Sequence, residues 1–124
     1  RLFCLQKQHG RDQIATAALP LLDLAPELDE GAEAFADTAA VLAQLDLVIT
    51  SDTALAHLAG GMGRPTWLVL PHAADWRWML DRDDSPWYPT MRLFRQPSPG
   101  AWGPVFAAVA AALEREISCK EPPC

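Results

Sequence analysis

Three consecutive residues, Ser51, Asp52 and Thr53, stand where an apolar run gives way to a helical pattern, and His57 follows four residues after Thr53. A helix start carries free backbone N–H groups and roughly half a positive charge, so it favours an anion without basic side chains. Residues four apart lie on one side of a helix, so the Thr53 hydroxyl and the His57 imidazole could both donate to a phosphate. The spacing predicts an anion site. The alternative, in which Asp52 or Ser51 caps the helix beside an ordinary packed surface histidine, stays open.

A further group of residues with binding chemistry lies in segment 72–88, which is rich in tryptophan and aspartate. Aromatic rings beside arginine suit the face of a nucleobase or a sugar, and Trp76 with Arg77 are the candidates. The alternative is a loop that seals the edge of a sheet with tryptophan side chains as plugs. We favour this alternative for Trp78 and Trp87.

Gln6 and Lys7 follow the first apolar run of the chain. The Lys7 ammonium could reach a phosphate as a point charge, although an ordinary solvated lysine is also compatible with the pattern. His9, His57 and His72 do not have the spacing of metal ligands, so we expect no metal and no cofactor.

A strand–helix–strand unit is predicted to position the first group. Apolar runs at 46–50 and 66–70 predict two strands, with a helix between them at 53–62 that glycines 60, 61 and 63 end. A right-handed crossover makes the strands parallel neighbours and places Ser51 at their carboxyl edge, where open α/β sheets bind ligands. Leu47, Val48 and Ile49 form a continuous apolar run, which is expected of a parallel strand covered on both faces. Leu55, Leu58 and Ala59 are predicted to form the inner face of the helix.

The rest of the chain continues the alternation of strands and helices. It predicts an α/β fold, a Rossmann-like open and mostly parallel sheet with helices on both faces. Further strands are predicted at residues 2–6, 21–24 and 91–95, the last at an edge of the sheet. Three further helices are predicted. One covers residues 12–19, and a second begins after an N-cap at Asp37. The third is C-terminal and places Val105, Val109, Leu113 and Ile117 on one face.

Composition limits the classes of partner. The chain has 124 residues, half of them hydrophobic, and a formal net charge of −6. One domain over residues 1–118 with a tail at 119–124 fits this length. The negative charge argues against nucleic acid and anionic membrane surfaces, and no apolar stretch is long enough for a membrane span. Cys4, Cys119 and Cys124 form no paired framework, so we expect a cytoplasmic protein.

Two stretches of the sequence resemble a known family: LDLVITSDTALAHLAGGMGRPTWLVLP at 45–71 and DWRWMLDRDDSPWYPTMRLFRQP at 75–97. The stretch at 45–71 resembles the C-terminal nucleotide-sugar-binding half of the heptosyltransferase-like glycosyltransferases, which are family 9 with a GT-B fold. The stretch at 75–97 is more specifically similar to the branch in which this domain is fused behind tetratricopeptide repeats. The resemblance covers most of the chain and implies a nucleotide-sugar donor as the ligand.

Carried over by position, Asp52, Thr53, Ala54 and His57 match the motif with which the family holds the diphosphate and the sugar. Ala54 stands where heptosyltransferases commonly have glycine. Residues and resemblance together give these substrate-binding candidates: Ser51, Asp52, Thr53, Ala54, His57, Gln6, Lys7, Trp76 and Arg77.

The resemblance implies the donor-binding part of a glycosyltransferase of hexosyl, heptosyl or GlcNAc type. The chain starts at Arg1 and enters an apolar run at once, so we expect an N-terminal truncation that removes a strand and the whole acceptor domain. We therefore expect no transfer by this chain alone, assign no catalytic residue, and expect exposed strand edges that could pair copies into a homo-oligomer. The alternatives are a non-catalytic module that binds nucleotide, phosphate or protein, and a purely structural fragment.

Overall fold

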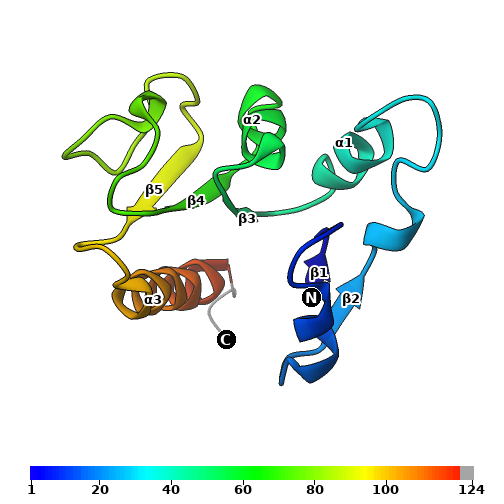
Figure 1. Cartoon of the computed structure of the whole chain (residues 1–124), viewed down its shortest axis with the longest axis horizontal. Coiled ribbons are helices and arrows are strands. Elements are labelled where there is room, and N and C mark those ends of the chain that lie inside the picture. Colours follow the sequence, from blue (N-terminus) through cyan, green and yellow to red (C-terminus); the bar gives the residue numbers. More distant parts are fainter. Residues whose placement is uncertain (121–124) are drawn as a thin grey trace. The chain divides into compact units, whose positions relative to one another are not determined.

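The computed structural model describes residues 1–120, and the chain divides into two compact units, Arg1–Gln44 (unit 1) and Leu45–Cys124 (unit 2). Each unit has its own parallel sheet, β1-β2 in unit 1 and β3-β4-β5 in unit 2 (Figure 1). The predicted α/β class with parallel strands is confirmed. The prediction of one domain over residues 1–118 stays a prediction.

Unit 1 is built from short elements. Strands β1 (Leu2–Cys4) and β2 (Leu21–Asp23) pair in parallel, and the 3-10 helix η1 (Arg11–Thr16) connects them. A further 3-10 turn, η2 (Ala25–Glu27), and helix α1 (Ala36–Leu42) follow. The strands predicted at 2–6 and 21–24 therefore exist but are shorter, and the helix predicted at 12–19 is a 3-10 helix.

Asp29 caps α1 from seven residues before the helix starts. Its carboxylate accepts hydrogen bonds from the backbone N–H groups of Asp37 at 3.0 Å and Thr38 at 3.2 Å, and from the Thr38 hydroxyl at 2.5 Å. Asp37 is the second residue of α1 and accepts from the Asp29 N–H instead, so the predicted N-cap at Asp37 is wrong. The Thr38 hydroxyl bond, helped by the charge of Lys7, holds the pKa of Asp29 below its ordinary value.

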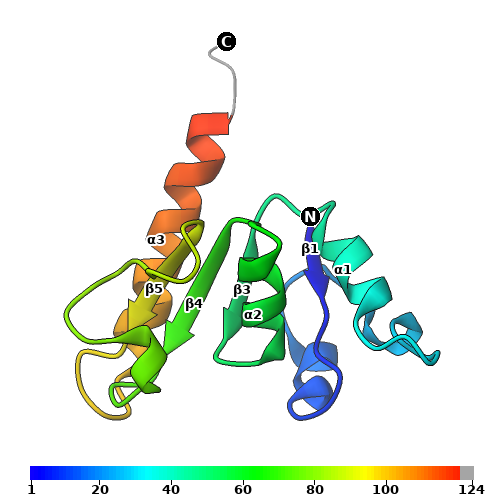
Figure 2. The same ribbon diagram turned by 90° about the horizontal axis from the view of Figure 1, so that it is seen from above.

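Unit 2 is a three-stranded sheet with strand β4 at its centre. Strands β3 (Val48–Ser51), β4 (Thr66–Leu70) and β5 (Met91–Arg95) are parallel neighbours (Figure 2). All five residues of β4 are buried, because helices cover both of its faces. The predicted strands 66–70 and 91–95 are confirmed to their bounds, and β5 lies at an edge as predicted.

The two faces of β4 pack on different helices, since successive side chains of a strand point to opposite sides. On one face, Leu68 and Leu70 pack with Ala56 of helix α2 (Ala54–Gly61). On the other face, side chains of β4 and β5 pack on helix α3 (Trp102–Lys120), as the two helices on opposite sides of the sheet in Figure 1 show. Each buried leucine contributes about 1.5–3 kcal/mol to the hydrophobic stabilisation. Within residues 1–120, no helix has both the length and the apolar character needed to cross a membrane.

Several predicted faces differ from the observed ones. Ile49 is 43% exposed because β3 is an end strand of this sheet, so full coverage of residues 47–49 is wrong. Helix α2 buries Ala56, Ala59 and Gly60, whereas Leu55 and Leu58 are only partly covered. Helix α3 buries Val105, Val109 and Ala112, and Ile117 is exposed.

The tail predicted at 119–124 begins inside the last helix, since Cys119 lies in α3. Residues 121–124 lie outside the described residues.

Candidate functional site

No side chain of the described residues caps the start of α2. Thr53 is the N-cap residue, in an extended conformation, and its hydroxyl lies 3.4 Å from both the Ser51 carbonyl and the Thr50 hydroxyl rather than bonding to the first turn. The alternative in which Ser51 or Asp52 caps this helix is therefore wrong. Ser51, Asp52, Thr53 and Ala54 are exposed at the carboxyl end of β3, where the first N–H groups of a helix favour an anion.

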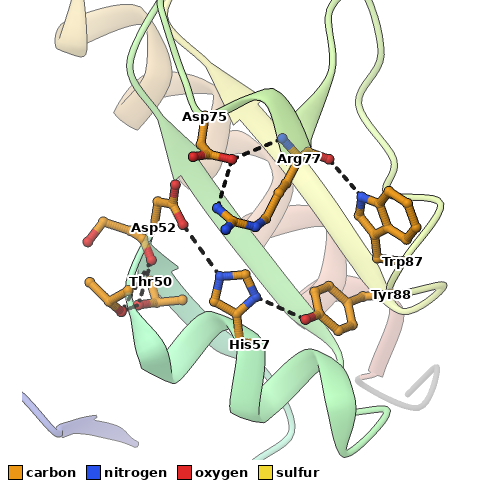
Figure 3. A network of polar contacts seen from close by, with 9 residues as sticks. Thr50, Asp52, His57, Asp75, Arg77, Trp87 and Tyr88 are labelled. Atoms are coloured by element: carbon orange, nitrogen blue, oxygen red, sulfur yellow. Dashed lines mark hydrogen bonds and ion pairs between the residues drawn. The ribbon is translucent and has the colours of Figure 1, made fainter.

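His57 connects this helix start to two other groups. Its Nε2 lies 3.8 Å from a carboxylate oxygen of Asp52, and its Nδ1 lies 2.9 Å from the Tyr88 hydroxyl (Figure 3). The ring stacks on Trp78 with centroids 5.4 Å apart and meets Tyr88 edge-on at 5.8 Å. The contact between His57 and Asp52 is open to solvent, since 37% and 31% of the two side chains are exposed, and it contributes little to stability.

A pocket of about 290 Å³ opens beside His57. Four aromatic residues supply most of its wall, and Trp76 is the most exposed of them, at 72%. The full set of lining residues is His57, Trp76, Arg77, Trp78, Trp87 and Tyr88. The structure thus brings together His57, Trp76 and Arg77, which the sequence predicted as separate candidates.

The two tryptophans predicted as plugs have different roles. Trp78 is 1% exposed and belongs to the core cluster under α2, which confirms the prediction for this residue. Trp87 is 53% exposed and lines the pocket, so the plugging role is wrong for it. Its indole N–H donates to the Arg77 carbonyl at 2.9 Å, which joins the two sides of the pocket wall.

The wall around Trp76 is fixed by a local cap. Asp75 precedes the 3-10 helix η3 (Trp76–Trp78) and accepts a hydrogen bond from the Arg77 N–H at 3.0 Å. The same carboxylate forms an ion pair with the Arg77 guanidinium at 2.9 Å, and this guanidinium lies over the Trp76 ring at 5.4 Å. Arg77 is therefore already oriented beside the ring, as Figure 3 shows for Asp75 and Arg77.

Sequence reasoning missed Tyr88 and the turn that holds it. The Ser85 hydroxyl, in a side chain that is nearly fully buried, accepts from the N–H groups of Trp87 at 3.2 Å and Tyr88 at 3.4 Å. The Met91 N–H, at the start of β5, donates to the Tyr88 carbonyl at 3.0 Å. The Ser-Pro pair at 85–86 is a turn signal that could have located this loop, but no local pattern reveals its partner on α2.

Arg82 and Asp84 form an ion pair in the loop between η3 and β5. The Arg82 Nε donates to an Asp84 carboxylate oxygen at 2.6 Å. This bond lowers the pKa of Asp84 and raises that of Arg82. Asp84 is exposed and Arg82 is partly exposed, so the pair orders the loop more than it stabilises the fold.

The structure shows Gln6 and Lys7 engaged inside unit 1. The Gln6 amide donates to the His9 carbonyl at 2.6 Å. The Lys7 ammonium donates to the Leu28 carbonyl and lies 3.6 Å from the Asp29 carboxylate. Both side chains stay exposed, and their predicted role at a phosphate stays a prediction.

Comparison with known proteins shows which protein family the chain resembles. The model of the family described as glycosyltransferase family 9 (heptosyltransferase) matches residues 1–68, which include the start of α2 and His57. Protein FlbA of Caulobacter vibrioides is 38% identical over 92 residues, which are 74% of this chain and 14% of that protein. The chain therefore spans about one seventh of the length of this relative. No solved structure matches.

Proposed function

The chain belongs to glycosyltransferase family 9, and from that membership we propose that unit 2 binds the nucleotide-sugar donor of a glycosyl transfer. The carrying observation is that one side chain, His57, contacts both halves of a site. Its Nε2 lies near Asp52 at the uncapped start of α2, and its ring lines the aromatic pocket. The site therefore offers the start of α2 to a diphosphate and the aromatic pocket to a ring of the same ligand.

The diphosphate is assigned to the start of α2. The first backbone N–H groups of α2, the Thr53 hydroxyl and His57 supply donors there, and the helix adds its positive end. Asp52 carries a negative charge, which would repel a phosphate in direct contact. We therefore assign Asp52 as a neighbour of His57 and not as a contact of the ligand itself.

The ring is assigned to the pocket. At about 290 Å³ the pocket lies at the lower end of the range for small-molecule sites, so it suits one ring system and not a whole nucleotide-sugar. Trp76 offers an exposed face, and Arg77 lies beside it. Both a sugar and a base can stack on such a face. A comparison of the affinities of the nucleotides with those of the corresponding nucleotide-sugars distinguishes the two possibilities. Segment 75–97 supplies five of the six residues that line the pocket, and from the resemblance of this segment we propose that the chain belongs to the branch fused to tetratricopeptide repeats.

The chemistry proposed for this site is electrostatic. When the bond between the sugar's anomeric carbon and the diphosphate breaks, negative charge grows on the diphosphate. Donors fixed at the start of α2 stabilise that charge more in the transition state than in the ground state. The described residues supply the donor side only, so we expect this chain to bind a donor without transferring the sugar, and the transfer itself belongs to the whole protein.

Titration calorimetry on the 124-residue chain with UDP, GDP, ADP and their sugars tests the proposal. We expect one nucleotide series to bind, and His57→Ala to weaken it about 10- to 100-fold, as the loss of a hydrogen bond to a charged group does. His9→Ala is the matched control, since it removes an exposed histidine of unit 1. Absence of binding to every ligand, or binding that His57→Ala leaves unchanged, would refute the proposal.

A further inference from the structure

Both ring nitrogens of His57 have a polar group near them, and the two groups differ in kind. Nδ1 lies 2.9 Å from the Tyr88 hydroxyl, and Nε2 lies 3.8 Å from the Asp52 carboxylate (Figure 3). A neutral imidazole carries its proton on only one nitrogen, so one nitrogen donates and the other accepts. The partners of the two nitrogens decide which one holds the proton.

The Asp52 carboxylate can only accept, whereas a tyrosine hydroxyl can donate or accept. With the proton on Nδ1, an unprotonated Nε2 would face the carboxylate, and two acceptors would oppose each other. With the proton on Nε2, the N–H lies on the nitrogen that is 3.8 Å from the Asp52 carboxylate, while Nδ1 accepts from the Tyr88 hydroxyl. This latter arrangement satisfies both sides.

We propose that Tyr88 is a positioning residue, which donates to Nδ1 of His57 and so keeps the imidazole N–H on Nε2, the nitrogen that faces the start of α2. This rests on the proposed function, because the N–H on Nε2 is the donor that a diphosphate there would use. Tyr88 acts on the ligand's phosphate only through His57.

The surroundings of Tyr88 hold its hydroxyl in this place. The backbone of Tyr88 is fixed on both sides, by the Ser85 hydroxyl and by the Met91 N–H. Its ring lies against Gly60, one turn of α2 after His57, where any side chain would occupy the same space. Trp78 stacks on the imidazole of His57, with ring centroids 5.4 Å apart, and also contacts the Tyr88 ring.

Long-range ¹H–¹⁵N correlation spectra of the histidine-labelled chain test the proposal without a ligand, at about pH 8.5, where a free imidazole is neutral. We expect His57 in the native chain to be protonated on Nε2, and Tyr88→Phe to introduce a population protonated on Nδ1. Thr90→Val is the matched control. Thr90 lies in the same loop before β5 as Tyr88, and its hydroxyl donates to the Arg64 carbonyl. Its removal should leave the His57 spectrum unchanged.

A mutant cycle adds the functional arm, with the tightest-binding nucleoside diphosphate among UDP, GDP and ADP as the probe. Tyr88→Phe should weaken binding about 3- to 10-fold in the native chain and have no effect when His57 is already alanine, because Tyr88 acts through His57. Equal effects in both backgrounds, or a His57 spectrum that Tyr88→Phe does not change, would overturn the inference. Absence of nucleotide binding would refute the proposed function, and the spectra would still decide the positioning role.

Discussion

Gly60 and Tyr88 are in such close contact that a Cβ atom at Gly60 would lie 2.6 Å from Cγ of the tyrosine ring. The ring comes from the loop before β5, and the glycine from the last turn of α2. Gly60 therefore lets a distant side chain rest directly on the helix backbone. This contact places the Tyr88 hydroxyl within hydrogen-bond distance of His57.

Replacing Gly60 with alanine should destabilise unit 2. Cγ is the root of the ring and cannot swing away, so the overlap costs about 1–3 kcal/mol, of which better helix propensity returns at most about 1 kcal/mol. Urea unfolding measures the difference. Gly61→Ala is the matched control, because open space surrounds its Cβ position, and it should leave the midpoint unchanged or slightly raise it. Equal midpoints for the two variants would show that the ring does not rest on the helix.

Trp76→Ala should weaken binding of the donor about 5- to 100-fold, because stacking of a ring on an aromatic side chain is worth about 1–3 kcal/mol. Calorimetry with the nucleotide and with its sugar conjugate shows which ring uses the pocket. If the sugar stacks there, only the conjugate loses affinity; if the base does, both lose it. Leu80→Ala is the control, since Leu80 is as exposed as Trp76, at 72%, and lies in the same segment. Equal effects of the two substitutions would argue against the pocket.

Asp29→Asn should lower the stability of unit 1 at neutral pH. The amide cannot match the carboxylate as an acceptor for three donors, while asparagine tolerates the positive φ of 52° found at this position. The folded-state pKa of Asp29 lies below the ordinary value of 3.8. Its stabilisation is therefore complete above that value and is lost as the pH falls through the lower folded-state pKa.

Thermal unfolding of the native and Asp29→Asn chains from about pH 7 to about pH 2.5 checks this. The gap between them should be widest at neutral pH and should narrow as the pH falls from about 3.8 through the lower folded-state pKa. Glu30→Gln removes the same charge from the exposed neighbouring residue and should show no such gap. A gap as wide at the acid end of the range as at neutral pH would mean that the carboxylate charge is not what caps α1.

The elements that the sequence predicted best are those whose signal is local. Strands β4 and β5 have the predicted bounds because β4 is an apolar run, β5 mixes apolar and charged residues as an edge strand does, and turn residues flank both. Gly63, with a φ of 66°, ends α2 as the glycine pattern indicated, through the bond from the Arg64 N–H to the Ala59 carbonyl.

The features that escaped prediction depend on residues far apart in the chain. Asp37 has the local pattern of an N-cap, but Asp29, folded back on the helix, takes that role. Gly60 resembles one more helix-ending glycine, and only the Tyr88 ring shows why a side chain is excluded there. The sequence favours a plug at Trp87 because nothing in it shows that the indole bonds to the Arg77 carbonyl across a pocket.

The His57–Tyr88 hydrogen bond spans 31 residues, and the order of events in folding follows from that separation. Tyr88 reaches His57 only when β5 has paired with β4, and pairing of parallel strands is a non-local and slow step. Helix α2 can form earlier, from local contacts alone. The aromatic pocket should therefore form only when β5 pairs with β4, which makes it the last part of unit 2 to form during refolding.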